Sequence, residues 1–490
     1  MVLLATVFVA SRWLLVQTSY AAHAHWEESV FLFSALEISH QGLSSVWDYQ
    51  DDLSHGGSVP LLLLATAAVA LCGPSMVALK AVCVAWSLGA FLLTVAAVRR
   101  AGGAGAALLS GVFLLALSPN LARLQVTLVG SHPEALLPAA AALWWLAKHD
   151  GTEGTVTRDS VAIGALAASA VWMSLTLAPW MAALAAVWWL GAPRRVAAAA
   201  GLLAGGIVGG TPWAYQNLYL RPHGATLWLQ RLGSSGAEFG AAQGAWGTLQ
   251  FLPESWGLGE AGVALTALAA LAWLALALAV GLREQAERRW LRVAGTLLLG
   301  SLLTAVSLAA THLQPAPNEG YYFARFFAPL QVQLLVIGSL AVDTWAARLG
   351  GWVRIAFGGA AVAIGVSSFA PLLYQGGEVP AVNVLLRRGC LVFGNAEYAR
   401  AGDGQRAVWR LMQLADAPCR EMACAGLGWA LADEYAATGR IEGARAALAA
   451  AGTTNCAQRI CGGMRFVLAR RAGILEERRK LPAEFGERCP

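Results

Sequence analysis

The chain has 490 residues, of which 57% are hydrophobic and only 13% charged, and its formal net charge is +5. Soluble globular proteins are about half apolar and carry about a quarter charged residues. A soluble domain with the composition of this chain could not bury all of its apolar surface. The composition therefore predicts an all-α, multi-pass membrane protein, in which each helix satisfies its own backbone hydrogen bonds within the lipid. The arginines form no patch, so nucleic acid is not an expected partner.

The first apolar run covers residues 2–20. It lacks the basic start and the clear cleavage site of a signal peptide, so we expect a retained membrane-spanning helix. A polar segment, 21–58, follows, and then an apolar run at 59–72. With about fourteen residues this run is too short to cross a bilayer, which needs roughly twenty. We expect it to be a helix at the membrane interface.

The later apolar runs are predicted to span the membrane, which gives about eleven spans in all. They cover 76–98, 104–119, 129–147, a hairpin of 160–178 and 180–190 broken at Pro179, 196–214, 261–281, 292–310, 326–345 and 353–372. Gly201, Gly205 and Gly209 recur every four residues in one of these runs. This spacing is typical of a small-residue face on which two helices pack closely.

Lysines and arginines cluster in every second connection, at positions 99/100, 148/158, 194/195, 283–292 and 348/354. The positive-inside rule places these connections in the cytoplasm. The connections 21–58, 120–131, 215–260 and 311–325 then face outward. The expected location is the inner membrane of a bacterium, crossed many times.

From about residue 373 the chain becomes charged and helical, and we expect this tail to be extracytoplasmic. The pattern Tyr398…Gly402…Ala407…Leu411 recurs 37 residues later, as Tyr435…Gly439…Ala444…Leu448. Repeated pairs of helices are typical of solenoid proteins, and the pattern loosely resembles tetratricopeptide repeats. The expected division is a transmembrane domain at 1–372 and a helical-repeat domain at 373–490.

Most of the cysteines lie in this tail, which suits an oxidising compartment: Cys390, Cys419, Cys424, Cys456, Cys461 and Cys489. Our preferred pairing closes each turn between repeats, with Cys419 bonded to Cys424 and Cys456 to Cys461, and leaves Cys390 with Cys489. The other pairings that six cysteines allow stay open. A zinc site is the rival interpretation, and it would need thiolates alone because the tail has no histidine.

The first candidate site is His25-Trp26-Glu27-Glu28, where the chain leaves the first apolar run. An ionisable residue beside the membrane is a functional hypothesis by default. A carboxylate there can act as a general base or hold a divalent cation. His25 and His55 are candidate substrate-binding residues. The alternative is that these side chains only solvate the start of a loop.

The second candidate site is Ser131-His132-Pro133-Glu134, at the outward end of a predicted span. His132 and Glu134 would contribute to substrate binding. The alternative is a capping box, with Ser131 as the N-cap and Glu134 as the third helical residue.

The third candidate site is the segment 318–325, in which Glu319, Tyr322 and Arg325 are the candidate binding residues. A guanidinium can bind a lipid-linked phosphate through two parallel hydrogen bonds. The alternative is that Arg325 extends to the lipid head groups.

The N-terminal pattern resembles the start of the GT-C glycosyltransferases, in their protein mannosyltransferase and lipid A aminoarabinose transferase branches. Glu27-Glu28 stands where these have an Asp-Glu pair, and His55-Gly-Gly-Ser-Val-Pro60 stands where they have a His/Lys-Pro-Pro motif before an interfacial helix. The likeness covers about residues 10–150. It implies sugar transfer from a polyprenyl-phosphate donor to a glycan, lipid or protein acceptor at the outer membrane face.

In such an enzyme Glu27 would be the base or cation ligand, with Glu28 as its neighbour. Glu134 would face the same cavity, and Arg325 would stabilise the departing phosphate. The tail would bind an acceptor or a protein partner, as helical repeats commonly do. The competing class is a non-enzymatic membrane protein, either a transporter or an envelope scaffold. A transporter predicts internal duplication of the membrane part, and the sequence contains none that we find.

Overall fold

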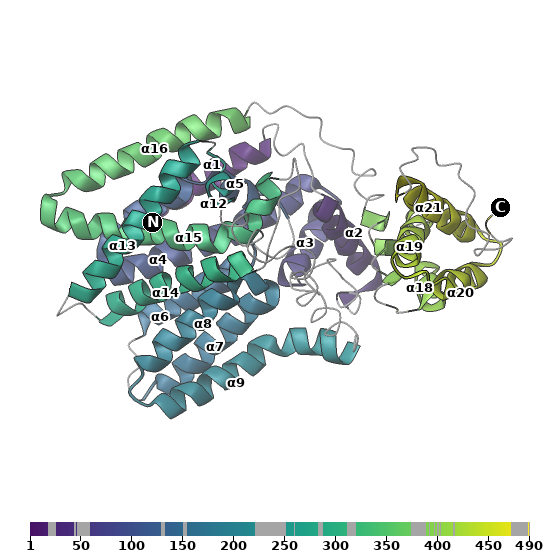
Figure 1. Cartoon of the computed structure of the whole chain (residues 1–490), viewed down its shortest axis with the longest axis horizontal. Helices are drawn as coiled ribbons and strands as arrows, with labels where there is room; N and C mark the ends of the chain where they lie inside the picture. Colours follow the sequence, from purple (N-terminus) through teal and green to yellow (C-terminus); the bar gives the residue numbers. More distant parts are fainter. Residues whose placement is uncertain are drawn as a thin grey trace. The chain divides into compact units, whose positions relative to one another are not determined.

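The structure is a computed structural model. It describes residues 1–17, 26–43, 46, 59–128, 133–149, 154–220, 251–258, 260–282, 288–310, 320–373, 389–391, 393–395, 397–398, 401, 403–414, 417–471 and 489. Every regular element within these residues is a helix (Figure 1). The expected all-α class is confirmed for this part of the chain.

The chain forms two compact units. The first consists of Met1–His23, Gly56–Leu61 and Lys80–Glu378, and the second of Ala24–His55, Leu62–Leu79 and Val379–Pro490. The second unit thus joins the C-terminal region to segments that the division at residue 372 assigned to the transmembrane domain.

The helices of the first unit are long and mostly apolar. They are α1 (Val2–Gln17), α4 (Met76–Ala116, except its first residues), α5 (Pro119–Leu124), α6 (Leu136–Lys148), α7 (Val156–Met173), α8 (Ala178–Leu190), α9 (Arg195–Ala214), α12 (Leu252–Ser255), α13 (Ala261–Leu282), α14 (Arg288–Ala310), α15 (Gly320–Leu349) and α16 (Trp352–Leu373). A 3₁₀ turn, Leu175–Leu177, separates α7 from α8, and a π-helical turn, Tyr215–Leu220, follows α9.

Six of the described helices are long and apolar enough to cross a membrane, namely α4, α9, α13, α14, α15 and α16. Shorter apolar helices cover Val2–Gln17, Val59–Cys72, Leu136–Lys148 and Leu175–Leu190. The expected count of about eleven spans is therefore not confirmed. The helix α3 (Val59–Cys72) has the bounds expected for the short apolar helix.

The 41-residue helix α4 holds two of the expected spans, because the chain folds back at Gly103, where φ is +83°. In α1, the Phe8 ring stacks on Phe91 at 4.9 Å, and Leu4, one turn earlier, fills the space beside Gly111. One helix face thus contacts residues on both sides of Gly103, so the two legs of α4 lie side by side.

The glycine face predicted in α9 packs closely on α7. A β-carbon on Gly205 would lie 2.1 Å from the Val161 carbonyl oxygen, and one on Gly209 would lie 2.1 Å from that of Ala165. A β-carbon on Gly206, by contrast, would meet no other atom within 4 Å. The structure therefore agrees with the predicted packing role of Gly201, Gly205 and Gly209.

Basic residues of alternate connections gather at one end of the first unit. Arg100 lies over the Trp144 ring at 5.9 Å. Arg292 donates hydrogen bonds to the carbonyl oxygens of His149 (3.3 Å) and Gly191 (3.1 Å). This arrangement agrees with the alternation of clusters in the sequence.

The other end of the first unit is built from connections that were expected to face outward. The backbone N–H of Asn120 in α5 donates to the carbonyl oxygen of Trp256, which follows α12 (3.4 Å). Phe251, Leu308, Phe327 and Leu330 form one buried cluster, which joins α12 to the end of α14 and the beginning of α15.

The second unit contains α2 (Trp26–Gln41), most of α3, α18 (Gly404–Leu411), α19 (Ala417–Thr438), α20 (Glu442–Ala451) and α21 (Asn455–Arg471). Two helical repeats are visible, because α18 packs on α20 and α19 packs on α21. The repeated apolar positions are buried in both copies, as Ala407 and Leu411 in α18 and as Ala444 and Leu448 in α20.

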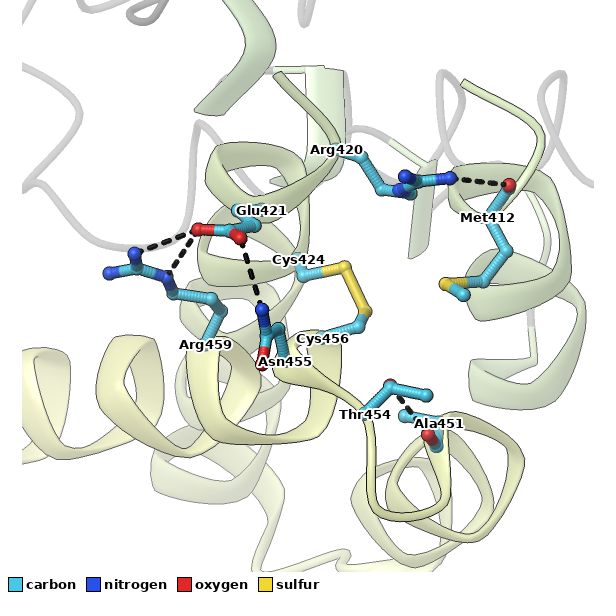
Figure 2. Close-up of a disulfide and its surroundings, with 9 residues drawn as sticks. All are labelled: Met412, Arg420, Glu421, Cys424, Ala451, Thr454, Asn455, Cys456 and Arg459. Carbon is cyan, nitrogen blue, oxygen red and sulfur yellow. Dashed lines mark hydrogen bonds and ion pairs between the residues drawn. A yellow bond between two sulfur atoms is a disulfide. The ribbon is translucent and has the colours of Figure 1, made fainter. Parts of the chain in front are cut away.

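The disulfides differ from our preferred pairing, which was wrong. The structure joins Cys390 to Cys419, Cys424 to Cys456 and Cys461 to Cys489. Cys419 and Cys424 lie in one helix, where residues five apart point about 140° away from each other. Their Cα atoms are too far apart, and their side chains point in directions too different, for a disulfide to form between them. The Cys424–Cys456 bond instead joins α19 to α21 (Figure 2).

Candidate functional site

Glu28 is fully buried in the first turn of α2. Burying a carboxylate costs free energy unless other groups compensate its charge. A merely solvated loop start would not bury this side chain, so the burial favours a specific role for Glu28. The backbone of Glu27 lies in the same turn of helix. His25, His55 and the side chain of Glu27 lie outside the described residues.

The helix that carries Glu28 packs on the C-terminal part of its own unit. Its Phe33 ring lies 5.1 Å from that of Phe393. A β-carbon on Gly389 would lie 2.3 Å from the carbonyl oxygen of Ser29 and 2.8 Å from the Phe33 β-carbon. The backbones of α2 and of residue 389 can approach this closely only because position 389 has no side chain.

Glu134 is buried in the first unit, with 4% of its surface exposed. The Trp86 indole N–H in α4 donates to its carbonyl oxygen at 2.7 Å. The alternative role in a capping box is wrong, because α6 begins at Leu136 and its N-cap is Ala135. Glu134 therefore precedes the helix, and its burial needs another explanation. His132 lies outside the described residues.

Arg325 is also buried in the first unit, with 2% exposed, and its guanidinium lies 4.8 Å from the centre of the Phe326 ring. An arginine that extends to lipid head groups has an exposed guanidinium. The burial of Arg325 therefore does not support this alternative. Glu319 lies outside the described residues, as does the side chain of Tyr322.

Next to Arg325 along α15, a buried polar network connects three elements. The Gln331 amide N–H₂ donates to the backbone oxygen (2.8 Å) and hydroxyl (2.9 Å) of Ser255, and its oxygen accepts from the Ser118 hydroxyl (3.0 Å). Asn120 donates to the same Ser255 carbonyl at 3.1 Å. Satisfied networks of this kind hold elements in a unique arrangement. Arg325 lies about 9 Å along the helix axis from Gln331, given 1.5 Å of rise per residue.

Two buried cations lie beside the segment that follows α5. The Arg12 Nε donates to the Gln125 side-chain oxygen at 2.8 Å, and the Lys80 ammonium donates to the Val126 carbonyl at 3.2 Å. Both cations are almost completely buried. The neighbouring hydroxyl of Ser87 bonds the Gln125 carbonyl at 3.3 Å. Since Ser87 follows Trp86 in α4, Glu134 and the two cations share one end of the first unit.

No protein-family model, curated protein or solved structure matches this chain.

An apolar groove of about 250 Å³ runs between α4, α13, α15 and α16. Its wall includes Leu334 and Val342 of α15, and it also includes Trp256. Trp256 is bonded to Asn120 through its backbone oxygen. One end of the groove therefore lies next to the buried polar network.

The structure thus places Glu134 and Arg325 at the same end of the first unit and Glu28 in the second unit. Among the described residues no group of three or more His, Cys, Asp or Glu side chains could hold a metal ion. Arg12, Lys80 and Gln331 were not singled out from the sequence. The available signal was a cationic or amide side chain within or beside an apolar run, which is unusual in a membrane helix.

Proposed function

We propose that the protein is a membrane glycosyltransferase of the GT-C type. It would transfer a sugar from a polyprenyl-phosphate donor to an acceptor at the outer face of the cytoplasmic membrane. The observation that carries the proposal is the full burial of Glu28, in a motif that follows the first apolar helix as the Asp-Glu pair does in that superfamily. The Glu27-Glu28 pair would supply the base or the cation ligand.

In this proposal the donor phosphate binds at the end of the first unit that holds Arg325. Negative charge develops on this phosphate when the sugar leaves, and buried guanidinium groups stabilise such charge most effectively where water is excluded. Arg12 and Lys80 are additional cations at the same end. The apolar groove that begins at Trp256 supports binding of the polyprenyl chain. About eleven membrane crossings and a periplasmic tail belong to the same proposal.

The test is sugar transfer from a polyprenyl-phosphate donor by the purified full chain, with Glu27→Gln and Glu28→Gln made singly and together. We expect at least one single variant and the double variant to lose transfer by about 100-fold or more, the usual contribution of a general base. Glu37→Gln is the matched control, because it makes the same change in the same helix. Unchanged transfer in the double variant, or none in the wild type, would reject the enzyme.

The alternative is a non-enzymatic scaffold of the cell envelope. The observation that favours it is an exposed apolar surface on the repeats, where Trp409 is 65% and Met412 39% exposed. A scaffold predicts that Trp409→Ala abolishes binding of an envelope partner while Glu28→Gln leaves it intact. The enzyme predicts loss of sugar transfer in Glu28→Gln or Glu27→Gln.

A further inference from the structure

A polar cavity of about 500 Å³ lies at the basic end of the first unit, far along the helices from Arg325. It is formed where α4 folds back and where α13, α14 and α15 approach this turn. Its lining includes three arginines, Arg99, Arg100 and Arg348, together with Asp343 and Trp290.

The described residues that line the cavity carry a net positive charge. Arg99, Arg100 and Arg348 line it, and none of the three forms an ion pair with a carboxylate among the described residues. Among the described residues of the lining, Asp343 is the one carboxylate. Its oxygen is bound by the Nε of Arg354 at 2.8 Å, which compensates its charge. Three guanidinium groups therefore remain to attract an anion.

The most deeply buried residues of the cavity lining are apolar, whereas its arginines are exposed. Trp290 is 5% and Ala101 8% exposed, and both line the cavity. At Gly103 the backbone has φ +83° and carries no side chain, so the chain can turn without filling the cavity. A ligand that fits these two surfaces carries an anionic group against the arginines and an apolar part against Trp290.

We propose that this cavity binds the phosphate-bearing head group of an anionic phospholipid. Guanidinium groups bind phosphate oxygens through paired, charge-assisted hydrogen bonds. Basic pockets between membrane helices on the cytoplasmic side are suited to lipid head groups. A free phosphate compound shares the anionic chemistry but would leave the apolar residues of the lining uncovered. This proposal does not depend on the glycosyltransferase assignment, because it concerns the other end of the unit.

The test is lipid binding to the purified full chain in a neutral detergent, measured by native mass spectrometry. Phosphatidylglycerol is titrated in one arm, phosphatidylcholine in a second and inorganic phosphate in a third. We expect one phosphatidylglycerol per chain, bound about tenfold more tightly than phosphatidylcholine, and only weak competition by inorganic phosphate. Equal binding of the two lipids overturns the proposal. Inorganic phosphate that binds as tightly as phosphatidylglycerol would show that the ligand is a free phosphate and not a lipid head group.

Variants separate a built site from general positive charge. Arg99→Gln with Arg348→Gln removes two lining cations, and we expect about a tenfold loss of phosphatidylglycerol affinity. The control is Arg194→Gln with Arg195→Gln, an exposed pair of arginines that does not line the cavity. It should change affinity less than about twofold. Equal losses in both pairs overturn the proposal. If the first pair does not fold, Arg99→Lys with Arg348→Lys keeps the charge, and unchanged affinity in it overturns the paired-hydrogen-bond geometry.

Discussion

Gly389 lies directly against the carbonyl oxygen of Ser29, the residue that follows the buried Glu28. The same type of contact holds the repeats together. In each case a glycine lies against a backbone carbonyl oxygen: Gly394 against that of Ala423, Gly426 against Leu391, Gly428 against Ile460 and Gly463 against Ala425. The helix α2 is thus packed like a further layer of the repeat stack. It follows that the tail fixes the helix that carries Glu28.

Replacing Gly389 by Val should detach α2 from this stack, because the new β-carbon would overlap the Ser29 carbonyl. We expect faster hydrogen exchange of the α2 amides in the full chain, measured by mass spectrometry, and a loss of about 1–3 kcal/mol in local stability, as for other overpacked sites. The control is Gly462→Ala in α21, where an added β-carbon meets nothing within 4 Å. Unchanged exchange in Gly389→Val would show that the contact does not hold α2.

The disulfide connectivity predicts which thiol each single substitution releases. Cys424→Ser should add Cys456 to the free thiols of the wild type, Cys72 and Cys83, because Cys424 and Cys456 are bonded. Alkylation of the unreduced protein, followed by peptide mass spectrometry, identifies the labelled cysteine. Labelling of Cys419 in this variant would instead support the pairing within one helix. The two bonded cysteines are 32 residues apart in sequence, so loss of the bond should cost about 3–4 kcal/mol of stability.

Neighbouring glycines of α9 should tolerate substitution differently. Gly205→Val places atoms on the Val161 carbonyl oxygen and should separate α9 from α7, whereas Gly206→Val points into open space. We expect Gly205→Val to lower the melting temperature of the detergent-solubilised chain, with a cost of about 1–3 kcal/mol, and Gly206→Val to have little effect. Equal melting temperatures for the two variants would contradict the close α7–α9 packing.

Protonation of Glu421 in acid should weaken the packing of α19 on α21. Its carboxylate accepts from Arg459 Nη2 at 2.8 Å and from the Asn455 amide at 3.3 Å (Figure 2). These hydrogen bonds lower the pKa of Glu421 below its ordinary value of 4.5. The folded state therefore holds fewer protons than the unfolded state between the two pKa values, so this contribution is fully present above pH 4.5 and lost as the pH falls through the folded pKa.

The measurement for Glu421 is hydrogen exchange of the α21 amides in wild type and Glu421→Gln between pH 3 and 7, corrected for the intrinsic rate. The two proteins should differ near neutral pH and converge in acid. Because the pair is exposed, about 1 M salt should reduce the difference. A difference that persists unchanged in acid would assign it to packing instead of charge.

Features that depend on local pattern could be predicted from the sequence. The bounds of α3 follow from the length of an apolar run between polar segments. The packing face of α9 follows from glycines four residues apart, because a helix brings such positions to one side. The fold at Gly103 lies between the two predicted spans, at a residue that adopts positive φ without strain.

Features that depend on contacts distant in sequence could not be predicted. The pairing of Cys390 with Cys419 requires knowing which helices are neighbours, and the spacing of cysteines alone does not contain this. The packing of Ser29 on Gly389 joins residues from opposite ends of the chain. The Gln331 network likewise joins three distant segments, and only the presence of an amide within an apolar span indicated it.

The three disulfides limit how far the C-terminal region can be stretched. Without them, the chain from Cys390 to Cys489 would extend to about 350 Å. With them, tension passes through the sulfur bridges, and only the two short stretches inside α19 and α21 can lengthen between bonded cysteines. The maximum extension is then about 50 Å. For the same reason, a single protease cut within any of the three closed loops releases no fragment until the bonds are reduced, whereas a cut between Cys419 and Cys424 or between Cys456 and Cys461 separates the region.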